Sequence, residues 1–270
     1  MSTSARERSY RVESVVLKRK DMGEADRLLT CFTRERGKLT LLATGARKPA
    51  SRKAGHVELF CHARFLVAKG RTWDIVTEAE TAEVYLPLRE DLLRTSYAYY
   101  VAELLDRLTE EQDEHAEMFD LFLATLGRLC ETQELRLPTR FFELRLLGLA
   151  GYRPELFTCL ECGESIQPQV NYFHYAKGGA LCPRCGEGAV GSRDISLAAL
   201  KVLRYMQTHD YAEMQKLQLR EAVHHDVEDV LYRYLTYILE QNLKSTRFLH
   251  LLREQQSAPA DVPARHGNAG

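Results

Sequence analysis

The sequence predicts an α+β multidomain protein: an N-terminal small β-barrel (OB-fold), then an all-α domain carrying an inserted four-cysteine zinc ribbon. Short segments with period-two patterning fill residues 1–80. From Pro87 onward apolar residues recur at steps of three and four, and two Cys-x-x-Cys pairs interrupt the helical part. With 270 residues the chain has room for about two domains. Its ordinary hydrophobic and charged content, 45% and 28%, excludes collagen-like and wholly disordered proteins.

Five strands are expected in the first 80 residues. The segments 10–17, 27–33, 38–43, 56–69 and 72–80 are rich in Val, Leu, Thr and Phe and are bounded by Gly or by charged turns. Because most of them follow one another without a helix between, we expect a small antiparallel barrel over 1–80. A five-stranded barrel of this size is typical of the OB-fold, and the SH3-like barrel is the alternative that the pattern leaves open.

Positive charge is concentrated in the barrel half. Residues 1–80 contain 17 Lys and Arg against 10 Asp and Glu, whereas the rest of the chain contains 20 against 28. The most basic stretch contributes seven cations: Arg34, Arg36, Lys38, Arg47, Lys48, Arg52 and Lys53. Pro49 and Ser51 predict an exposed loop there, and basic loops beside a small barrel can follow a phosphate backbone. The alternative is a solvated loop without a partner.

Three aromatic residues of the barrel half could either pack in the core or contact nucleic acid. Trp73, Phe32 and Tyr10 could stack on bases, but we expect them to lie in the barrel core.

Helical periodicity predicts an all-α domain over 81–156 and 191–252. Its segments are 92–108, 118–129, 140–150, 196–207 and 223–243, with Ser196 as a candidate N-terminal cap. Residues 253–270 are expected to form a disordered tail, because few large apolar residues remain there. The polar N-terminus and the lack of a long apolar run predict neither a secretory signal nor a membrane span, and hence a cytoplasmic protein.

Four cysteines between the helical segments form the strongest motif. Cys159 and Cys162 are followed by Cys182 and Cys185, and a Gly follows each pair. Two intervening residues allow a tight turn to direct both sulfurs at one tetrahedral ion, so we expect a zinc ribbon over 157–190. Four thiolates close the coordination shell, which predicts one structural zinc per chain.

The other candidates for metal binding and catalysis are weaker. His174 is either a substitute ligand or, as we expect, a packing residue, and the remaining cysteines, Cys31, Cys61 and Cys130, are expected to be small buried hydrophobes. The sequence contains no nucleophile elbow, phosphate-binding loop or dinucleotide fingerprint, so we expect no enzyme.

Long motifs give the chain a resemblance to a known family. The runs LKRKDMGEADRLLTCFTRERGKL at 17–39 and ATGAR at 43–47, and LRLLGLAGY at 144–152 leading into the cysteines, resemble the bacterial DNA repair protein RecO family. The resemblance implies an N-terminal OB-fold with a basic loop, then a helical domain with a zinc module. Some members of the family lack the cysteines, which favours a structural zinc. Thr44 departs from the pattern, because some relatives have a basic residue there.

The resemblance also implies a function in homologous recombination. Such proteins bind single- and double-stranded DNA, anneal complementary strands and, with RecR, help RecA replace the single-stranded-DNA-binding protein SSB. They bind the acidic, apolar-ended C-terminal tail of SSB. We expect that tail on the helical half, where cations lie near apolar stripes: Arg204, Lys216, Arg220, Arg233 and Arg247. An RNA-binding or transcription-associated zinc-ribbon protein is the alternative.

Overall fold

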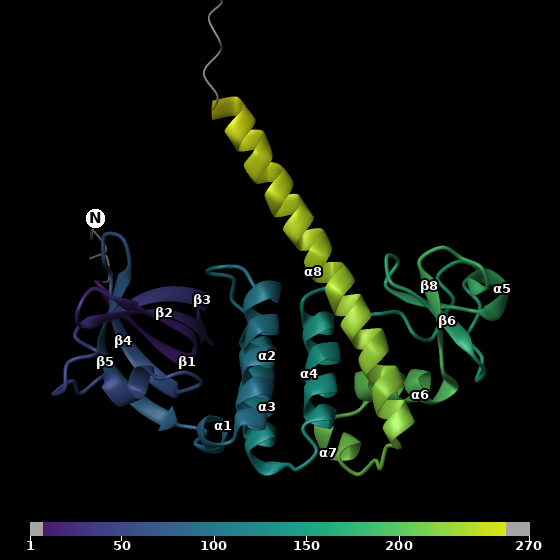
Figure 1. Ribbon diagram of the computed structural model, residues 1–270, viewed down its shortest axis with the longest axis horizontal. Helices are drawn as coiled ribbons and strands as arrows, with labels where there is room; N and C mark the ends of the chain where they lie inside the picture. Colours follow the sequence, from purple (N-terminus) through teal and green to yellow (C-terminus); the bar gives the residue numbers. More distant parts are fainter. Residues whose placement is uncertain (1–7, 258–270) are drawn as a thin grey trace, which may run out of the picture.

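The computed structural model of the protein describes residues 8–257, and beyond residue 240 it describes the backbone alone. Figure 1 shows a β-barrel, a central group of helices and a small sheet on the far side of the helices. The helices α2 (Leu92–Leu108) and α3 (Ala116–Glu131) lie nearest the barrel. The helical part therefore separates the barrel from the cysteine-bearing sheet.

The barrel is closed by five strands. They are β1 (Ser9–Met22), β2 (Asp26–Thr33), β3 (Gly37–Ala43), β4 (His62–Ala68) and β5 (Asp74–Glu83). Their order around the barrel is β1-β2-β3-β5-β4, and β3 and β5 pair in parallel while the other neighbours are antiparallel. This arrangement confirms the OB-fold, and the SH3-like alternative is wrong.

The first strand contributes to two hydrophobic cores. The register of β1 against β2 shifts between Val16 and Lys18, which marks a β-bulge. Val16 lies in the barrel core, whereas Val15 and Leu17 belong to the core of the helical domain. Pairing continues to Met22, so the strand runs five residues beyond the predicted end. The bulge thus allows a single strand to join both domains.

The predicted strand over 56–69 is only partly correct. Ala54–Val57 form a 3₁₀ turn, and the strand begins at His62. Phe60 has a left-handed φ of 60°, and the Cys61 N–H donates to the Glu58 carbonyl 3.1 Å away. Apolar residues occur in this stretch without forming a strand because the compact turn also buries side chains, those of Val57, Phe60 and Cys61.

The central helices pack around a core rich in phenylalanine and leucine. Besides α2 and α3 they are α1 (Pro87–Glu90), α4 (Arg136–Leu149), α6 (Leu197–Thr208), α7 (Tyr211–Met214) and α8 (Glu221–Ser257). Phe119, Phe122 and Phe142 are fully buried at its centre. The Ser196 hydroxyl accepts the Ala199 N–H at 3.1 Å, so the predicted cap of α6 is confirmed.

The small sheet lies between α4 and α6 in the chain. It consists of β6 (Asn171–His174), β7 (Gly179–Leu181) and β8 (Ser192–Ile195) in the order β7-β6-β8, with the short helix α5 (Pro183–Gly186). Phe173, Leu181 and Ile195 belong to the same core as the helices. The sheet is therefore anchored on the helical domain by shared apolar packing.

The last helix is longer than predicted. α8 continues to Ser257, so residues 253–257 are helical where we expected the tail, and 258–270 lie outside the described residues. Arg253, Glu254 and Gln255 are good helix formers, whereas Pro259 disfavours helix at the residue before it. No helix within 8–257 is long and apolar enough to cross a membrane.

Candidate nucleic-acid interface and metal centre

The basic loop, residues 44–53, is an ordered part of the barrel. The Arg47 N–H donates to the Ala25 carbonyl at 2.9 Å, and the Gly45 N–H donates to Asp26 Oδ1 at 2.7 Å. A further turn joins the Ser51 N–H to the Lys48 carbonyl at 2.9 Å. These bonds tie the loop to the β1–β2 hairpin, so its cations have defined positions.

Three of the four cations in the basic loop face solvent. Lys48 and Arg52 are exposed, and neither forms an ion pair within the described part of the chain. Arg47 is also exposed; its guanidinium lies 3.3 Å from Asp21 Oδ2 and donates to the Gly23 carbonyl. Residues 47, 48 and 52 can therefore present positive charge to a polyanion.

Lys53 points inward instead. Its Nζ donates to the Val76 carbonyl at 2.8 Å and to Thr44 Oγ1 at 3.3 Å, and burial lowers its pKa. Thr44, the residue that departs from the family pattern, thus accepts a hydrogen bond from this ammonium. A second cation at position 44 would repel Lys53.

Lys38 does not face solvent; it joins the barrel to the helical domain. Its side chain is 13% exposed, and Nζ donates to the carbonyls of Asp106 and Thr109, both at 2.7 Å. The same Nζ lies 3.2 Å from the Asp106 carboxylate, which also pairs with Lys18. Lys38 is therefore a structural residue here rather than a free cation.

Arg34 and Arg36, which precede Lys38 in the chain, differ from each other in their surroundings. Arg34 Nη2 lies 2.9 Å from Asp120 Oδ2 on α3, so this guanidinium also links the two domains. Arg36 is exposed and lies over the ring of Tyr10, 4.2 Å from the centroid. Among the described residues, three of the seven predicted cations are exposed without an ion pair (Arg36, Lys48, Arg52), and three have partners that join parts of the fold (Arg34, Lys38, Lys53). Arg47 is exposed and also pairs with Asp21.

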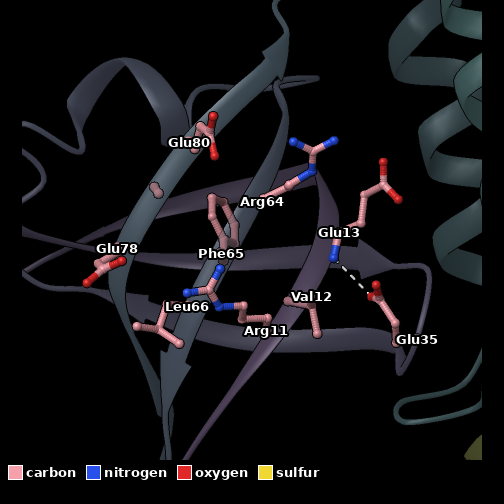
Figure 2. Close-up of a pocket in the computed structure, with 10 residues that line it drawn as sticks. Arg11, Val12, Glu13, Glu35, Arg64, Phe65, Leu66, Glu78 and Glu80 are labelled. Atoms are coloured by element: carbon pink, nitrogen blue, oxygen red, sulfur yellow. Dashed lines mark hydrogen bonds between the residues drawn. The ribbon is translucent and has the colours of Figure 1, made fainter.

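The outer face of β1, β4 and β5 has a different charge. A cavity of about 270 Å³ lies there, and Figure 2 shows Arg11 and Arg64 among four glutamates. These glutamates are Glu13, Glu35, Glu78 and Glu80. Four carboxylates against two guanidinium groups make this face unfavourable for a polyanion.

The four predicted cysteine ligands converge. The sulfur atoms of Cys159, Cys162, Cys182 and Cys185 all lie within 4.8 Å of one another. Cys162 and Cys182 Sγ are 3.8 Å apart, which is about the edge of a tetrahedron whose metal–sulfur distance is 2.3 Å. Among the described residues, no other group of three or more His, Cys, Asp or Glu brings its ligand atoms together in this way. The four cysteines could hold a metal ion.

Local turns prepare the first cysteine as a thiolate. The Gly163 N–H donates to the Cys159 carbonyl with Gly163 at a φ of 71°, and the Cys182 N–H points to Cys159 Sγ at 3.4 Å. Burial raises the pKa of Cys159, but N–H groups of Cys162 and Cys182 outweigh it and lower that pKa to about 7. Backbone donors of this kind stabilise the charged sulfur that a metal requires.

The remaining cysteines and the ribbon histidine lie elsewhere. Cys31 and Cys61 are fully buried in the barrel core, where burial raises the pKa of Cys31 to about 12, and Cys130 is half-buried. His174 is outside the four-cysteine cluster and accepts from the Lys177 N–H.

A cationic cavity of the helical domain was missed in the sequence. It has a volume of about 400 Å³ between α3, α4 and α6. Its charged lining residues are Arg145, Arg153 and one carboxylate, Glu117, and its apolar lining consists of Leu121, Phe141, Leu144 and Leu149. Arg145 lies over the Phe141 ring, 5.1 Å from its centroid. The pattern that could have revealed the cavity is the apolar run 144–152, which has one arginine inside it and another directly after it.

Most of the cations that the sequence suggested for the helical half have partners. Arg204 donates to the Leu156 carbonyl, Lys216 pairs with Glu213 at 2.6 Å, and Arg233 pairs with Asp229 at 2.7 Å. Arg220 is exposed, and the side chain of Arg247 lies outside the described residues.

Comparisons with known proteins agree over nearly the whole chain. Residues 8–85 match the family described as "Recombination protein O N terminal", and 89–247 match "Recombination protein O C terminal". The "DNA repair protein RecO" of Roseiflexus sp. (strain RS-1) is 41% identical over 259 residues, covering 95% of this chain and 91% of the relative. Proteins of the same name from Desulforudis audaxviator (strain MP104C) and Dehalococcoides mccartyi (strain ATCC BAA-2266 / KCTC 15142 / 195) are 37% and 32% identical, each covering 90% of this chain and 96% of the relative.

Proposed function

The chain belongs to the recombination protein O family of DNA repair proteins, and on this premise we propose a non-enzymatic recombination mediator. It binds single- and double-stranded DNA, anneals complementary strands and, with RecR, helps to load RecA on SSB-coated DNA. It acts in the cytoplasm at the nucleoid. The division into domains is 1–80 for DNA binding, 81–156 with 191–252 for the helical part, and 157–190 for the ribbon.

The observation that carries the proposal is the ordered, exposed charge of the basic loop. Arg47, Lys48 and Arg52 contact phosphates, because their side chains face solvent from fixed positions on the barrel. Phosphate contacts position a strand without reading its sequence, which suits a protein that anneals any complementary pair. Cations that neutralise phosphates reduce the repulsion between two strands and leave the bases free to pair.

Two double variants test this assignment on the full chain. Lys48→Ala with Arg52→Ala removes two positive charges from the basic loop, and Arg11→Ala with Arg64→Ala removes two from the glutamate-rich face of Figure 2. Each lost single-strand contact flattens the log–log salt slope by about 0.7, so the first variant loses about 1.4 units and the control none. Fluorescence anisotropy of labelled oligonucleotides at several salt concentrations gives both slopes. Equal slopes in two folded variants would place the DNA elsewhere.

Annealing distinguishes this function from the alternative. The mediator accelerates pairing of complementary DNA strands, including strands coated with SSB, whereas an RNA-binding or transcription-associated ribbon protein has no need to do so. Mixing labelled complementary oligonucleotides with and without the protein measures the rate. The basic-loop variant should lose acceleration in proportion to its lost DNA occupancy.

Zinc is the metal that best suits the four cysteines. Four thiolates at tetrahedral spacing match a closed Zn²⁺ site, and a closed shell leaves no position for a reactive water. Cys159 and Cys162 would be joined through the ion to Cys182 and Cys185, which stabilises the ribbon on its helical support. Zinc is therefore structural in this proposal.

The tail of SSB docks in the cationic cavity between α3, α4 and α6. An acidic peptide with an apolar end matches the apolar lining together with Arg145 and Arg153. Arg153→Ala should weaken binding of a tail peptide to the full chain, and Arg220→Ala, an exposed cation outside this lining, should not. Isothermal titration measures both affinities; equal weakening, or none, would contradict the site.

A further inference from the structure

A separate cavity lies on the barrel beside the only tryptophan of the chain. It has a volume of about 300 Å³ and lies between β3, the 69–73 loop and the segment that links α2 to α3. Its lining includes Tyr10, Thr40, Trp73, Asp74, Glu111 and Gln112. Both the barrel and the helical domain therefore contribute walls, and the volume is at the lower end of the range for small-ligand sites.

Hydrogen bonds hold these walls in place. Asp74 accepts from the Tyr10 hydroxyl at 2.7 Å and from the Gly70 N–H at 3.0 Å, which holds the 69–73 loop against β1. On the other side, the Gln112 N–H donates to the Lys38 carbonyl and Thr40 Oγ1 donates to Glu111, both at 3.0 Å. The cavity is thus preformed rather than dependent on a moving loop.

The chemistry of the cavity suits a neutral aromatic group. Trp73 is half-buried in the wall, in contrast to Phe32, which is fully buried against the helical core. Lys38 also lines the cavity, but its Nζ donates to the carbonyls of Asp106 and Thr109 and is not free for a ligand. The carboxylates of Asp74 and Glu111 would repel a phosphate, whereas Glu111 and Gln112 can exchange hydrogen bonds with the polar edge of a base.

Around this cavity, the cations that form no ion pair among the described residues belong to residues next to the lining rather than to the lining itself. Arg36 lies over the ring of Tyr10, which lines the cavity, and Arg71 is exposed on the 69–73 loop directly before the lining residues Thr72 and Trp73. This arrangement matches a nucleotide whose base enters and whose phosphate stays outside. The strand face and the loop between the fourth and fifth strands are also where OB-folds hold oligonucleotides.

We propose that this cavity binds one unpaired base of single-stranded DNA, which stacks on Trp73 while Arg36 and Arg71 hold the flanking phosphates. The inference rests on the proposed DNA-binding function and adds a base-binding site to it. A base paired within a duplex cannot enter, so the site distinguishes single strands from duplexes. Pairing with a complementary strand would withdraw the base and weaken the hold on the product.

Because Trp73 is the only tryptophan, its fluorescence reports on this cavity alone. Titration of the full chain with a single-stranded oligonucleotide should quench the emission as the base stacks. A blunt duplex of the same sequence, at equal occupancy by anisotropy, should leave the emission unchanged. Quenching by both to the same extent would overturn the selectivity and with it the proposal.

Substitution provides a second measurement. Trp73→Ala should lower the affinity for single-stranded DNA about tenfold, which is the contribution typical of one base stacked on an aromatic side chain. The affinity for duplex DNA should fall by less than twofold. Tyr232→Ala, at an aromatic residue 61% exposed on α8, is the control and should change neither.

The outcomes separate this inference from the proposed function. Single-strand binding by anisotropy, with unchanged emission of the wild-type protein, would overturn the base site and leave DNA binding intact. Absence of any DNA binding would overturn the proposed function itself. The emission measurement needs no variant, so it decides even if Trp73→Ala fails to fold.

Discussion

Substitution of Lys38 tests whether a cation in a basic stretch serves the fold or the DNA. Lys38→Met keeps the aliphatic part of the side chain and removes the ammonium that donates to the carbonyls of Asp106 and Thr109. Lys18→Met is the matched control, because Lys18 pairs with the same Asp106 carboxylate but its side chain is 58% exposed. One variant removes a buried link between domains, and the other removes a surface ion pair.

The burial of the two ammonium groups sets the expected magnitudes. A hydrogen bond from a charged donor contributes about 1.5–3 kcal/mol. Its loss leaves the carbonyls of Asp106, a partly buried residue, and of Thr109, a buried one, without the donor they have in the wild type. Allowing for the cost of burying the ammonium in the wild-type protein, we expect Lys38→Met to lower the free energy of unfolding by about 2–3 kcal/mol. Lys18→Met should lower it by less than about 1 kcal/mol, as is typical of exposed pairs.

The pH dependence of Lys38→Met has a definite sign. Burial raises the pKa of Asp106, but Lys18 and Lys38 outweigh it, so that the pKa is lowered in the folded protein. A carboxyl group whose pKa is lowered by folding stabilises the protein at pH values above its ordinary pKa. That stabilisation is lost as the pH falls through the pKa of the folded state. Lys38→Met should therefore lose less stability on acidification than the wild type.

Urea unfolding, together with the salt slope of DNA binding, decides the case. Lys38→Met should show a lower urea midpoint with an unchanged salt slope, because its ammonium does not face solvent. A variant as stable as the wild type with a salt slope flattened by about 0.7 would refute this reasoning and make Lys38 a phosphate contact.

Three further predictions concern the helical domain, the ribbon and the domain joint. Burial raises the pKa of Glu143 from 4.5 to about 7, so the folded protein binds more protons than the unfolded chain between those pH values. Its free energy of unfolding should therefore fall by up to about 3 kcal/mol as the pH rises through that range. Glu143→Gln, compared with the wild type by urea unfolding at pH 5 and pH 8, should lose this pH dependence, and a fall that persists in the variant would contradict the assignment. Metal analysis of the purified protein should find one zinc per chain. Cys159→Ser should lose the zinc and unfold at a lower temperature, while its affinity for DNA stays within about twofold of the wild type. Wild-type protein that contains no metal after purification without chelator would contradict the zinc site. Gly37 has a φ of 60°, and a Cβ at this position would lie 1.8 Å from the Asp113 carbonyl oxygen. Gly37→Ala should therefore lower the free energy of unfolding in urea by at least about 2 kcal/mol. Gly55→Ala, where a Cβ has open space, is the control, and equal effects of the two substitutions would refute the steric argument.

Local patterns in the sequence determined most of the elements and the two cysteine pairs. Two residues between Cys159 and Cys162, repeated at Cys182 and Cys185, predict that the two sulfurs of each pair lie close together, because a short turn sets that spacing. The folded ribbon then brings together the two pairs, which lie 20 residues apart in the chain. The cap at Ser196 and the helical periods after Pro87 were predictable for the same reason. Such features depend on residues a few positions apart.

Local patterns failed where a compact turn imitates a strand. Val57, Leu59 and Cys61 occupy alternate positions as in a strand, yet the chain forms a 3₁₀ turn over Ala54–Val57 and the strand begins only at His62. Alternating residue types predict burial of every second residue, but the turn buries Val57, Phe60 and Cys61, at a spacing that differs from that of a strand.

Only the tertiary structure decided which polar side chains are free to act. Lys38 and Lys48 belong to the same basic stretch, but α2 brings the Asp106 and Thr109 carbonyls to Lys38, whereas Lys48 remains exposed. The cavity beside Trp73 likewise requires Glu111, which the fold brings to β3 from a distant part of the chain. Whether a charged side chain is free depends on its neighbours in space. Here those neighbours are residues about 70 positions away in the chain, so no local sequence pattern could have predicted the contacts.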